Sequence, residues 1–165
     1  MASQLASRLQ VPRLELDSIR HQADWKELPD EEFALKTKAF VSQEGWVVDG
    51  NYFAQVTERV VWPAADTVVW LDVPKSLVMR QVTLRTLKRG TLRQELWNGN
   101  RERLRNAFSL DPLKSMIVWS WTTYQPVQDR YDQATSDPKW EHLTFIRLRS
   151  QQAERQLLEG VTPPS

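Results

Sequence analysis

Two aspartates end short runs of strand-like sequence. Asp17 closes the alternating run Arg13-Leu14-Glu15-Leu16-Asp17, and Asp49 closes the apolar run Trp46-Val47-Val48-Asp49. Ligands of open α/β sheets bind at the carboxyl ends of the strands, so we expect both carboxylates to face one crevice. A carboxylate there can hold water on Mg²⁺ or accept the proton of a substrate hydroxyl. The alternative is that each aspartate caps the helix after it. Gly50, which lets backbone approach a ligand closely, favours the functional role for Asp49.

A basic segment lies between Arg80 and Arg105. It holds eight basic and two acidic residues in a chain whose net charge is +1. Arginine side chains match phosphate geometry, and a lid of arginines can neutralise charge during phosphoryl transfer. The alternative is a solvated helix face. Within this segment, Trp97-Asn98-Gly99-Asn100 predicts a structured turn, because asparagines on both sides of a glycine favour a break in a helix.

The composition is that of an ordinary globular domain. The 165 residues are 41% hydrophobic and 26% charged, and the low net charge gives no general attraction to nucleic acid or anionic membranes. The absence of cysteine excludes disulfides and thiolate metal sites, and two histidines make no histidine-rich metal site. No apolar stretch reaches the ~20 residues that span a bilayer, and no signal region begins the chain. We expect one cytoplasmic domain, residues 1–165, without a membrane partner.

Strand-like runs alternate with helical patterns along the chain. Two further runs are Thr67–Val73, which Pro74 stops, and Leu143–Leu148. We expect Asp72, within the first of these, to bind local turn amides. Helical patterns cover 2–10, a segment from Pro29, Lys75 to about Arg89 with a break at Gly90, Leu92 to about Phe108, Asp111 to about Ala134, and 151–159. This alternation predicts an α/β fold, a parallel sheet with helices on both faces. Its core would be 1–79 and 135–160, and a helical lid would span about 80–134.

Several motifs follow one another in a specific order. They are Leu-Ala-x-Arg-Leu, Glu-Leu-Asp, Pro-Asp-Glu-Glu-Phe, Trp-Val-Val-Asp-Gly-Asn-Tyr, Asp-Thr-Val-Val-Trp-Leu-Asp-Val-Pro, Glu-Leu-Trp-Asn-Gly-Asn-Arg-Glu and Leu-x-x-Ile-Arg-Leu-Arg-Ser. This order resembles bacterial P-loop proteins related to adenylate kinase, often called topology modulation proteins or adenylate kinase-like ATPases. The resemblance covers about residues 3–155.

The resemblance implies a P-loop NTPase-like fold, ATP and Mg²⁺ as cofactors, and transfer of the γ-phosphate to a small-molecule acceptor such as a nucleotide. It assigns the catalytic role to Asp49, Arg85, Arg89 and Arg101. It assigns ATP binding to Ser3, Asp49 and Ser150, with Ser3 and Asp49 as Mg²⁺ ligands. The acceptor side would comprise Asp17, Gly50, Asn51, Tyr52, Asn98 and Asn100.

The chain departs from this family at its start. Met1-Ala2-Ser3-Gln4-Leu5 stands where the family has Gly-Lys-Ser/Thr-Thr-Leu, so the phosphate-binding lysine, its glycine-rich loop and the strand before them are missing. Since that strand is central in the family's sheet, its neighbours are expected to have unpaired edges. The sequence therefore predicts a truncated or degenerate kinase, from start-codon choice or gene decay, with weak or no ATPase activity.

One alternative is a non-catalytic module that binds nucleotides or phosphate. A weaker alternative is a nucleic-acid-associated protein, although no helix-turn-helix or zinc signature supports it. The acceptor and the oligomeric state stay open.

Overall fold

The computed structural model describes residues 1–92, 95–100, 111 and 115–162. Its elements, in chain order, are α1 (Ala2–Leu9), β1 (Arg13–Glu15), α2 (Leu16–Arg20), η1 (Ala23–Trp25), α3 (Asp30–Val41), β2 (Val47–Asp49), η2 (Phe53–Val61), η3 (Trp62–Ala64), β3 (Thr67–Leu71), α4 (Lys75–Thr91), η4 (Trp97–Gly99), α6 (Met116–Ala134), η5 (Pro138–Trp140), β4 (Thr144–Leu148) and α7 (Gln151–Gly160). The segment η2 is a π-helix, and the other η segments are single 3₁₀ turns.

The strands form two parallel pairs rather than one sheet. β1 pairs with β2, with Leu14 opposite Val48, and β3 pairs with β4, with Val69 opposite Ile146. Within the described part of the chain, no hydrogen-bonded ladder joins β2 to β3. The mixed α/β class with parallel strands is confirmed, the single sheet is not observed, and the P-loop arrangement remains a prediction.

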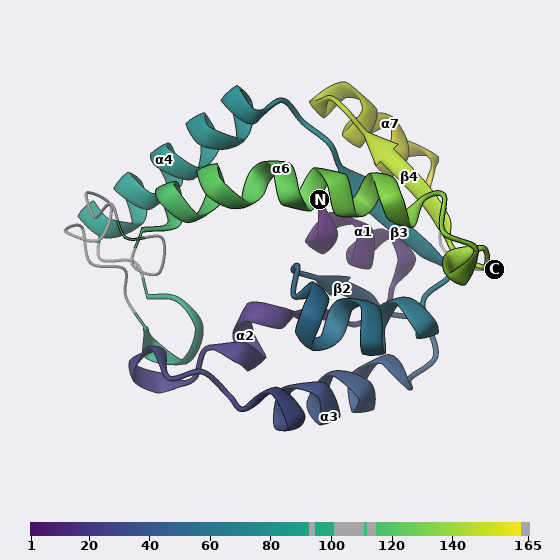
Figure 1. Ribbon diagram of the computed structural model, residues 1–165, viewed down its shortest axis with the longest axis horizontal. Coiled ribbons are helices and arrows are strands. Elements are labelled where there is room, and N and C mark those ends of the chain that lie inside the picture. Colours follow the sequence, from purple (N-terminus) through teal and green to yellow (C-terminus); the bar gives the residue numbers. More distant parts are fainter. Residues whose placement is uncertain (93–94, 101–110, 112–114, 163–165) are drawn as a thin grey trace.

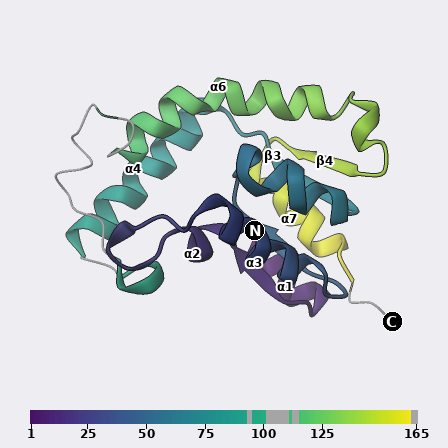
Figure 2. The same cartoon turned by 60° about the horizontal axis from the view of Figure 1, so that its bottom comes forward.

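Helices lie on both sides of the strands. Figures 1 and 2 together show α1 and α7 on one side, and η2 and α6 on the other. α1 contacts β1, β2 and α7, and α7 in turn contacts β4, so the first of these helical layers extends across both strand pairs. β1, β2 and β3 are each followed by helical elements that lead to the next strand, which is the connection that parallel strands require.

Two apolar clusters pack between the strands and η2, the first together with α6 and the second together with α2 and α3. The first is built around Trp62, which makes edge-to-face contacts with Trp140 and Phe145. The second is built around Phe33 and Leu16, both fully buried. Val48 of β2 contacts both clusters. Since residues alternate between the two faces of a strand, Val48 faces η2 and its neighbour Val47 faces the opposite side.

The helical boundaries differ from expectation in three places. α4 continues through Gly90 and ends at Thr91, two residues beyond the predicted end at about Arg89. The helix predicted from Leu92 to Phe108 is not observed at residues 92 and 95–100, which form a turn and the 3₁₀ element η4, and the remainder of this range lies outside the described residues. α6 begins at Met116, with Ser115 as its cap. α4 and α6 pack against each other, and the carboxyl-terminal end of α6 also packs into the cluster around Trp62.

Two helices were not expected. α2 begins directly after β1, so Asp17 lies in the first turn of a helix and not at the end of a strand. The π-helix η2 contains Val56, Thr57, Val60 and Val61, β-branched residues that have low helix propensity. Val56 is completely buried and Thr57 is 4% exposed, so tertiary packing outweighs local preference here.

Candidate functional site

Three carboxylates gather where β1 and β2 end: Glu15, Asp17 and Asp49. Arg13 pairs with Glu15 and lies 3.5 Å from Asp49, from its Nη1 to Oδ2. Burial raises the pKa of Asp49, Glu15 and Asp17 raise it further, and Arg13 acts in the opposite direction. We call these three residues the acidic cluster. Asp17 and Asp49 lie in the same region, but only Asp49 ends a strand, because Asp17 lies in the first turn of α2.

Neither aspartate caps a helix. The cap position of η2 is Tyr52, whose N–H is bound by the Thr57 hydroxyl. The cap position of α2 is Glu15, and it makes no side-chain capping bond. The capping alternative considered for Asp17 and Asp49 is therefore wrong.

Asp17 is held by Tyr52. The Tyr52 hydroxyl donates to Asp17 Oδ1 at 2.6 Å and lies 3.3 Å from His21 Nε2. Burial, followed by the bond to Asp17, raises the pKa of Tyr52, so the phenol stays protonated and acts as the donor. The Asp17 side chain is 41% exposed, and among described residues its Oδ2 receives no hydrogen bond. Asp17 is thus oriented through Oδ1, on a side chain that is partly exposed and whose Oδ2 has no partner among the described residues.

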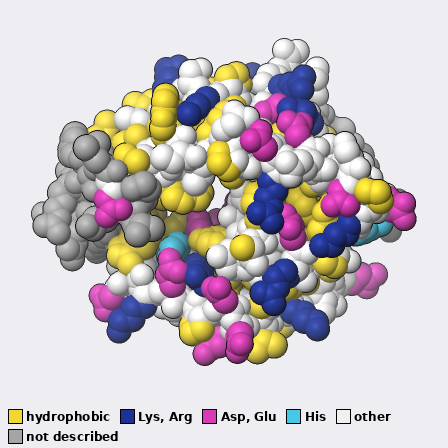
Figure 3. Space-filling model, viewed as in Figure 1, with side chains coloured by type: hydrophobic (Ala, Val, Ile, Leu, Met, Phe, Trp, Pro, Cys, Tyr) yellow, Lys and Arg dark blue, Asp and Glu magenta, His cyan; other side chains and the backbone are white. Residues whose placement is uncertain are grey.

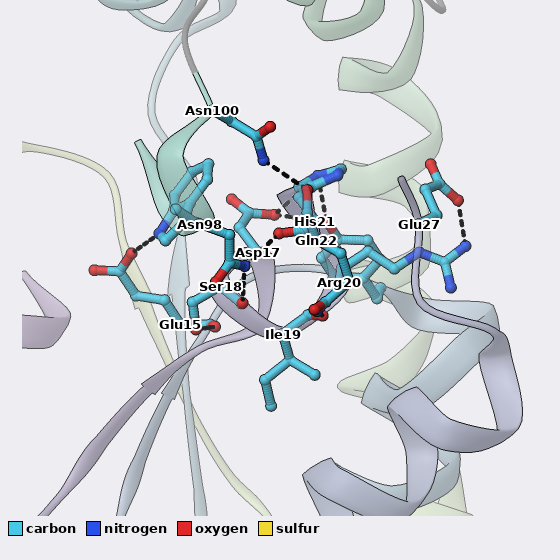
Figure 4. Close-up of polar contacts among 12 residues, drawn as sticks. Glu15, Asp17, Ser18, Ile19, Arg20, His21, Gln22, Glu27, Asn98 and Asn100 are labelled. Atoms are coloured by element: carbon cyan, nitrogen blue, oxygen red, sulfur yellow. Dashed lines mark hydrogen bonds and ion pairs between the residues drawn. The ribbon is translucent and has the colours of Figure 1, made fainter. Parts of the chain in front are cut away.

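The Trp97–Asn100 turn packs beside the acidic cluster. Its side chains bind Glu15 of the cluster and the backbone of the α2–η1 segment, which follows Glu15 in the chain. The Trp97 indole N–H donates to Glu15 Oε2 at 2.6 Å. Asn98 donates to the carbonyls of Ser18 and His21, at 3.1 and 2.6 Å (Figure 4). We call residues 97–100 the docking turn. The prediction of a structured turn here is confirmed, since Asn98 and Gly99 both have positive φ.

Asn100 completes the docking of this turn. It is 4% exposed, donates to the Gln22 carbonyl at 2.8 Å and accepts from the Trp25 N–H at 2.9 Å. The side chains of Asn98 and Asn100 therefore bind backbone of the α2–η1 segment. Both were predicted to bind substrate, and in this structure their hydrogen bonds position the turn.

Gly50 and Asn51 follow the acidic cluster. Gly50 has a φ of +133°, and a Cβ there would lie 2.9 Å from Leu16 Cβ. The close approach predicted at this glycine is therefore an approach to Leu16. The Asn51 Oδ1 is buried and, like His21 Nδ1, has no hydrogen-bond partner in the described part of the chain.

The residues present do not form a complete Mg²⁺–ATP site. Ser3 is exposed in the first turn of α1. The charge of the Met1 amino group slightly lowers the pKa of Asp49, which shows that the start of α1 lies near the end of β2. However, no group of three histidine, aspartate or glutamate residues suited to a metal occurs within the described ranges. No glycine-rich loop or lysine accompanies Ser3. One carboxylate and one hydroxyl leave most of a Mg²⁺ coordination shell to other groups.

The other predicted site residues have separate positions. Arg85 and Arg89 lie on α4, and Arg101 lies outside the described residues. The Ser150 hydroxyl caps α7 by accepting from the Ala153 N–H at 3.1 Å. Asp72 was expected to bind turn amides, but its Oδ2 accepts from Arg147 and Arg149, at 2.8 and 3.2 Å. That expectation is wrong because β4 places both arginines beside the end of β3.

Two clefts lie away from the acidic cluster. One, of about 350 Å³, is lined by residues of η2, α6 and η5, among them the ion pair between Glu58 and Arg130. The other, of about 210 Å³, lies where β2 and β3 begin and is lined by Trp46 and Thr67 among others. On the face shown in Figure 3, acidic and basic side chains are interspersed without a patch of one sign. No helix in the described ranges is long and apolar enough to cross a membrane.

The sequence reasoning did not assign Glu15, His21 or Trp97 to this region. Glu15 could have been found, since it lies two residues before Asp17 in the same strand-like run. Comparison of the chain with protein-family models, curated proteins and solved structures gives no match. The resemblance to adenylate kinase-like proteins therefore rests on the sequence motifs.

Proposed function

We propose that this chain carries the acceptor side of a P-loop-type phosphotransferase and binds a small phosphorylated molecule beside the acidic cluster. The observation that carries the proposal is the arrangement of Asp17, which Tyr52 orients through Oδ1 and whose Oδ2 has no partner among the described residues. An acceptor hydroxyl that reaches this oxygen can transfer its proton there. Asp49, whose pKa is raised by burial and by the neighbouring Glu15, lies in the same cluster, and carboxylates with pKa values perturbed in this way are candidate functional residues.

The docking turn supports the same proposal. It belongs to the segment in which basic residues concentrate, and it rests on the α2–η1 backbone beside Asp17. A segment that covers the acceptor side can exclude water and bring cations to a phosphate. Without the phosphate-binding lysine and loop, positioning of the β- and γ-phosphates would be poor, so we expect ATP hydrolysis by residues 1–165 to be far slower than the order of one per second of ordinary enzymes.

Calorimetry on folded protein tests the proposal. Nucleoside monophosphates and triphosphates, with and without Mg²⁺, are titrated into the wild type, Asp17→Asn and Tyr52→Phe. We expect a monophosphate to bind the wild type, and both variants to weaken this binding about tenfold or more, which corresponds to about 1.4 kcal/mol. The matched control is Glu31→Gln, in the first turn of α3, which should bind like the wild type.

The outcomes separate the alternatives. Binding without turnover would favour the non-catalytic module over a residual enzyme. Turnover of Mg²⁺–ATP at an ordinary rate would contradict the expected weakness. No heat with any ligand, on protein shown to be folded, would refute the proposal. Binding that is insensitive to Asp17→Asn would place the ligand elsewhere.

A further inference from the structure

The two strand pairs leave facing edges that carry unused backbone groups. In a parallel pair, the N–H and C=O of one residue point to the same neighbouring strand, and those of the next residue point away. The Val47 N–H donates to the Pro12 carbonyl at 3.0 Å, on the β1 side. The N–H and C=O of Val48 therefore point away from β1.

The same reasoning applies to β3. The Asp72 N–H donates to the Leu148 carbonyl at 2.9 Å, and the Thr144 N–H donates to the Asp66 carbonyl at 2.8 Å. Even-numbered residues of β3 therefore face β4, and the backbone groups of Thr67, Val69 and Leu71 face away from it. In the described part of the chain, no other strand pairs with β2 or β3. Unpaired strand edges of this kind are templates for a further strand.

Helices already cover both sides of the space between these edges. Val48 of β2 and Val68 of β3 pack into the one cluster built on η2 and η3, which bridges the two pairs on that side. On the other side α1 contacts β2 and α7, and α7 contacts β4 (Figures 1 and 2). With a helical layer on each side, the groups left without partners are those of the strand backbone.

Two further observations locate the gap. The cleft of about 210 Å³ lies between the start of β2, at Gly45 and Trp46, and the start of β3, at Asp66 and Thr67. Leu71, at the opposite end of β3, is 43% exposed although it lies in an otherwise apolar strand. The cleft therefore marks an opening of the gap at the end where both strands begin, and the exposed Leu71 side chain shows that one face of β3 is uncovered at its other end.

We propose that the edges of β2 and β3 form a strand-acceptor site, which is filled by a short, extended, apolar polypeptide segment that pairs with both strands in parallel. A strand is favoured over a helix or a globular partner because the space lies between two helical layers and the unused groups are backbone N–H and C=O. The residues before β2 and those at the start of β3 line the same cleft, so the two strands begin at the same end of the gap and one segment can be parallel to both. Recognition by strand addition takes its affinity from main-chain hydrogen bonds and its specificity from alternate side chains. Apolar β-branched residues fit, because Val48 and Val69 flank the gap.

A synthetic peptide tests the proposal on the protein of residues 1–165. The probe is an acetylated and amidated peptide of about seven residues that alternates valine and threonine, with a terminal lysine for solubility, long enough to span the five residues of β3. Hydrogen exchange is measured residue by residue with and without the peptide. We expect slowing of at least about tenfold at the amides of Val48, Val69 and Leu71, and little change at those of Val47 and Asp72, which already have partners.

Controls distinguish strand addition from adhesion to an apolar surface. The same peptide with proline at its central position loses a donor and should not bind. Leu71→Lys places a charge at the open edge and should weaken binding at least tenfold. Leu35→Lys changes a leucine that is 67% exposed on α3 and should leave binding unchanged.

Three results would overturn the proposal. The first is an absence of binding at millimolar peptide, and the second is equal slowing at edge and inner amides. The third is concentration-dependent dimerisation without peptide that protects the same edge amides, because the occupant would then be a second copy of the chain. None of these measurements uses a phosphorylated ligand, so failure here is distinguishable from failure of the proposed function.

Discussion

Asn100 offers the most direct test of how the docking turn is held. Its side chain is 4% exposed and makes two hydrogen bonds, to the Gln22 carbonyl and from the Trp25 N–H. Both partners are backbone groups about 75 residues earlier in the chain. Asn100→Ala removes both bonds and leaves one donor and one acceptor without partners.

The expected loss follows from these two groups. A partner that is left unsatisfied costs about 1–3 kcal/mol when it is fully buried. Trp25 is 41% exposed, so water reaches this region and the lower end of that range applies. We therefore expect Asn100→Ala to lower the free energy of unfolding by about 2 kcal/mol, or about 1 kcal/mol for each bond.

Urea unfolding followed by circular dichroism measures this loss, and hydrogen exchange at the Trp25 amide reports on the turn directly. The matched control is Asn98→Gly. It removes an exposed side chain and introduces glycine, which tolerates the backbone φ of 55° at this position. We expect it to cost about 1 kcal/mol or less, because water can replace bonds at an exposed site. If both variants release the same turn, the double variant should lose less than the sum of the two. The reasoning fails if Asn100→Ala unfolds within about 0.5 kcal/mol of the wild type and the Trp25 amide keeps its protection.

Two further predictions concern the residues around β2. Gly50→Ala should destabilise the fold by about 2 kcal/mol or more, since a Cβ would lie 2.9 Å from Leu16 Cβ at a φ of +133°. Gly99→Ala, at a φ of +78° with no atom within 4 Å of the added Cβ, should cost only about 1 kcal/mol of backbone strain, and equal losses in urea unfolding would refute the steric argument. Asp49→Asn should change how stability depends on pH, because the pKa of Asp49 is raised in the folded protein. As the pH rises from about 3.9, the pKa of the unfolded chain, through the higher pKa of the folded protein, we expect the wild type to lose stability relative to the variant. Unfolding of both proteins across this pH range checks the sign, and a wild type that gains stability relative to the variant would contradict it.

The sequence predicted the local elements well where a pattern of apolar residues was long or its ends were marked. The strand-like run from Thr67 and the helix from Lys75 occur with Pro74 between them, as expected. The helix 151–159 is confirmed within one residue. The Trp97–Asn100 turn was predicted because glycine and asparagine accept positive φ, which is a property of each residue and not of its surroundings.

Packing between distant segments was not predictable in the same way. Four of the nine residues of the π-helix η2 are β-branched, with a local preference against a helix, and the burial of Val56 and Thr57 against other segments explains why it forms. Leu16 illustrates the same limit. It extends the alternating strand pattern in the sequence, yet it begins α2 and is completely buried against Gly50 and the cluster around Phe33.

The candidate site was predicted in part for a related reason. Glu15 and Asp49 end two paired parallel strands, which end at the same edge, and Asp17 follows two residues after Glu15 in the first turn of α2. The rule about strand ends can be applied to a sequence. The partners of these carboxylates come from elsewhere in the chain: Tyr52 lies 35 residues after Asp17, and Trp97 lies 82 residues after Glu15. Asn98 and Asn100 were predicted to bind substrate, and in the structure their hydrogen bonds go to backbone, which no residue type indicates.

The segments that hold the acidic cluster in place connect the proposed phosphate-ligand site with the proposed strand-acceptor site. β1 and β2 are three residues long, and an isolated two-stranded pair is marginal in water, so the sheet alone cannot fix Glu15 and Asp49. Their positions depend instead on α1, η2 and the docking turn, which contact these strands or the segments after them. A strand added along β2 would pair the backbone of Val48, the residue immediately before Asp49. It would therefore restrict Asp49 without contacting its carboxylate. The peptide should therefore slow hydrogen exchange at the Val48 amide in Asp17→Asn as much as in the wild type. The strand-acceptor site uses the backbone N–H and C=O of β2, and this substitution changes only a carboxylate side chain.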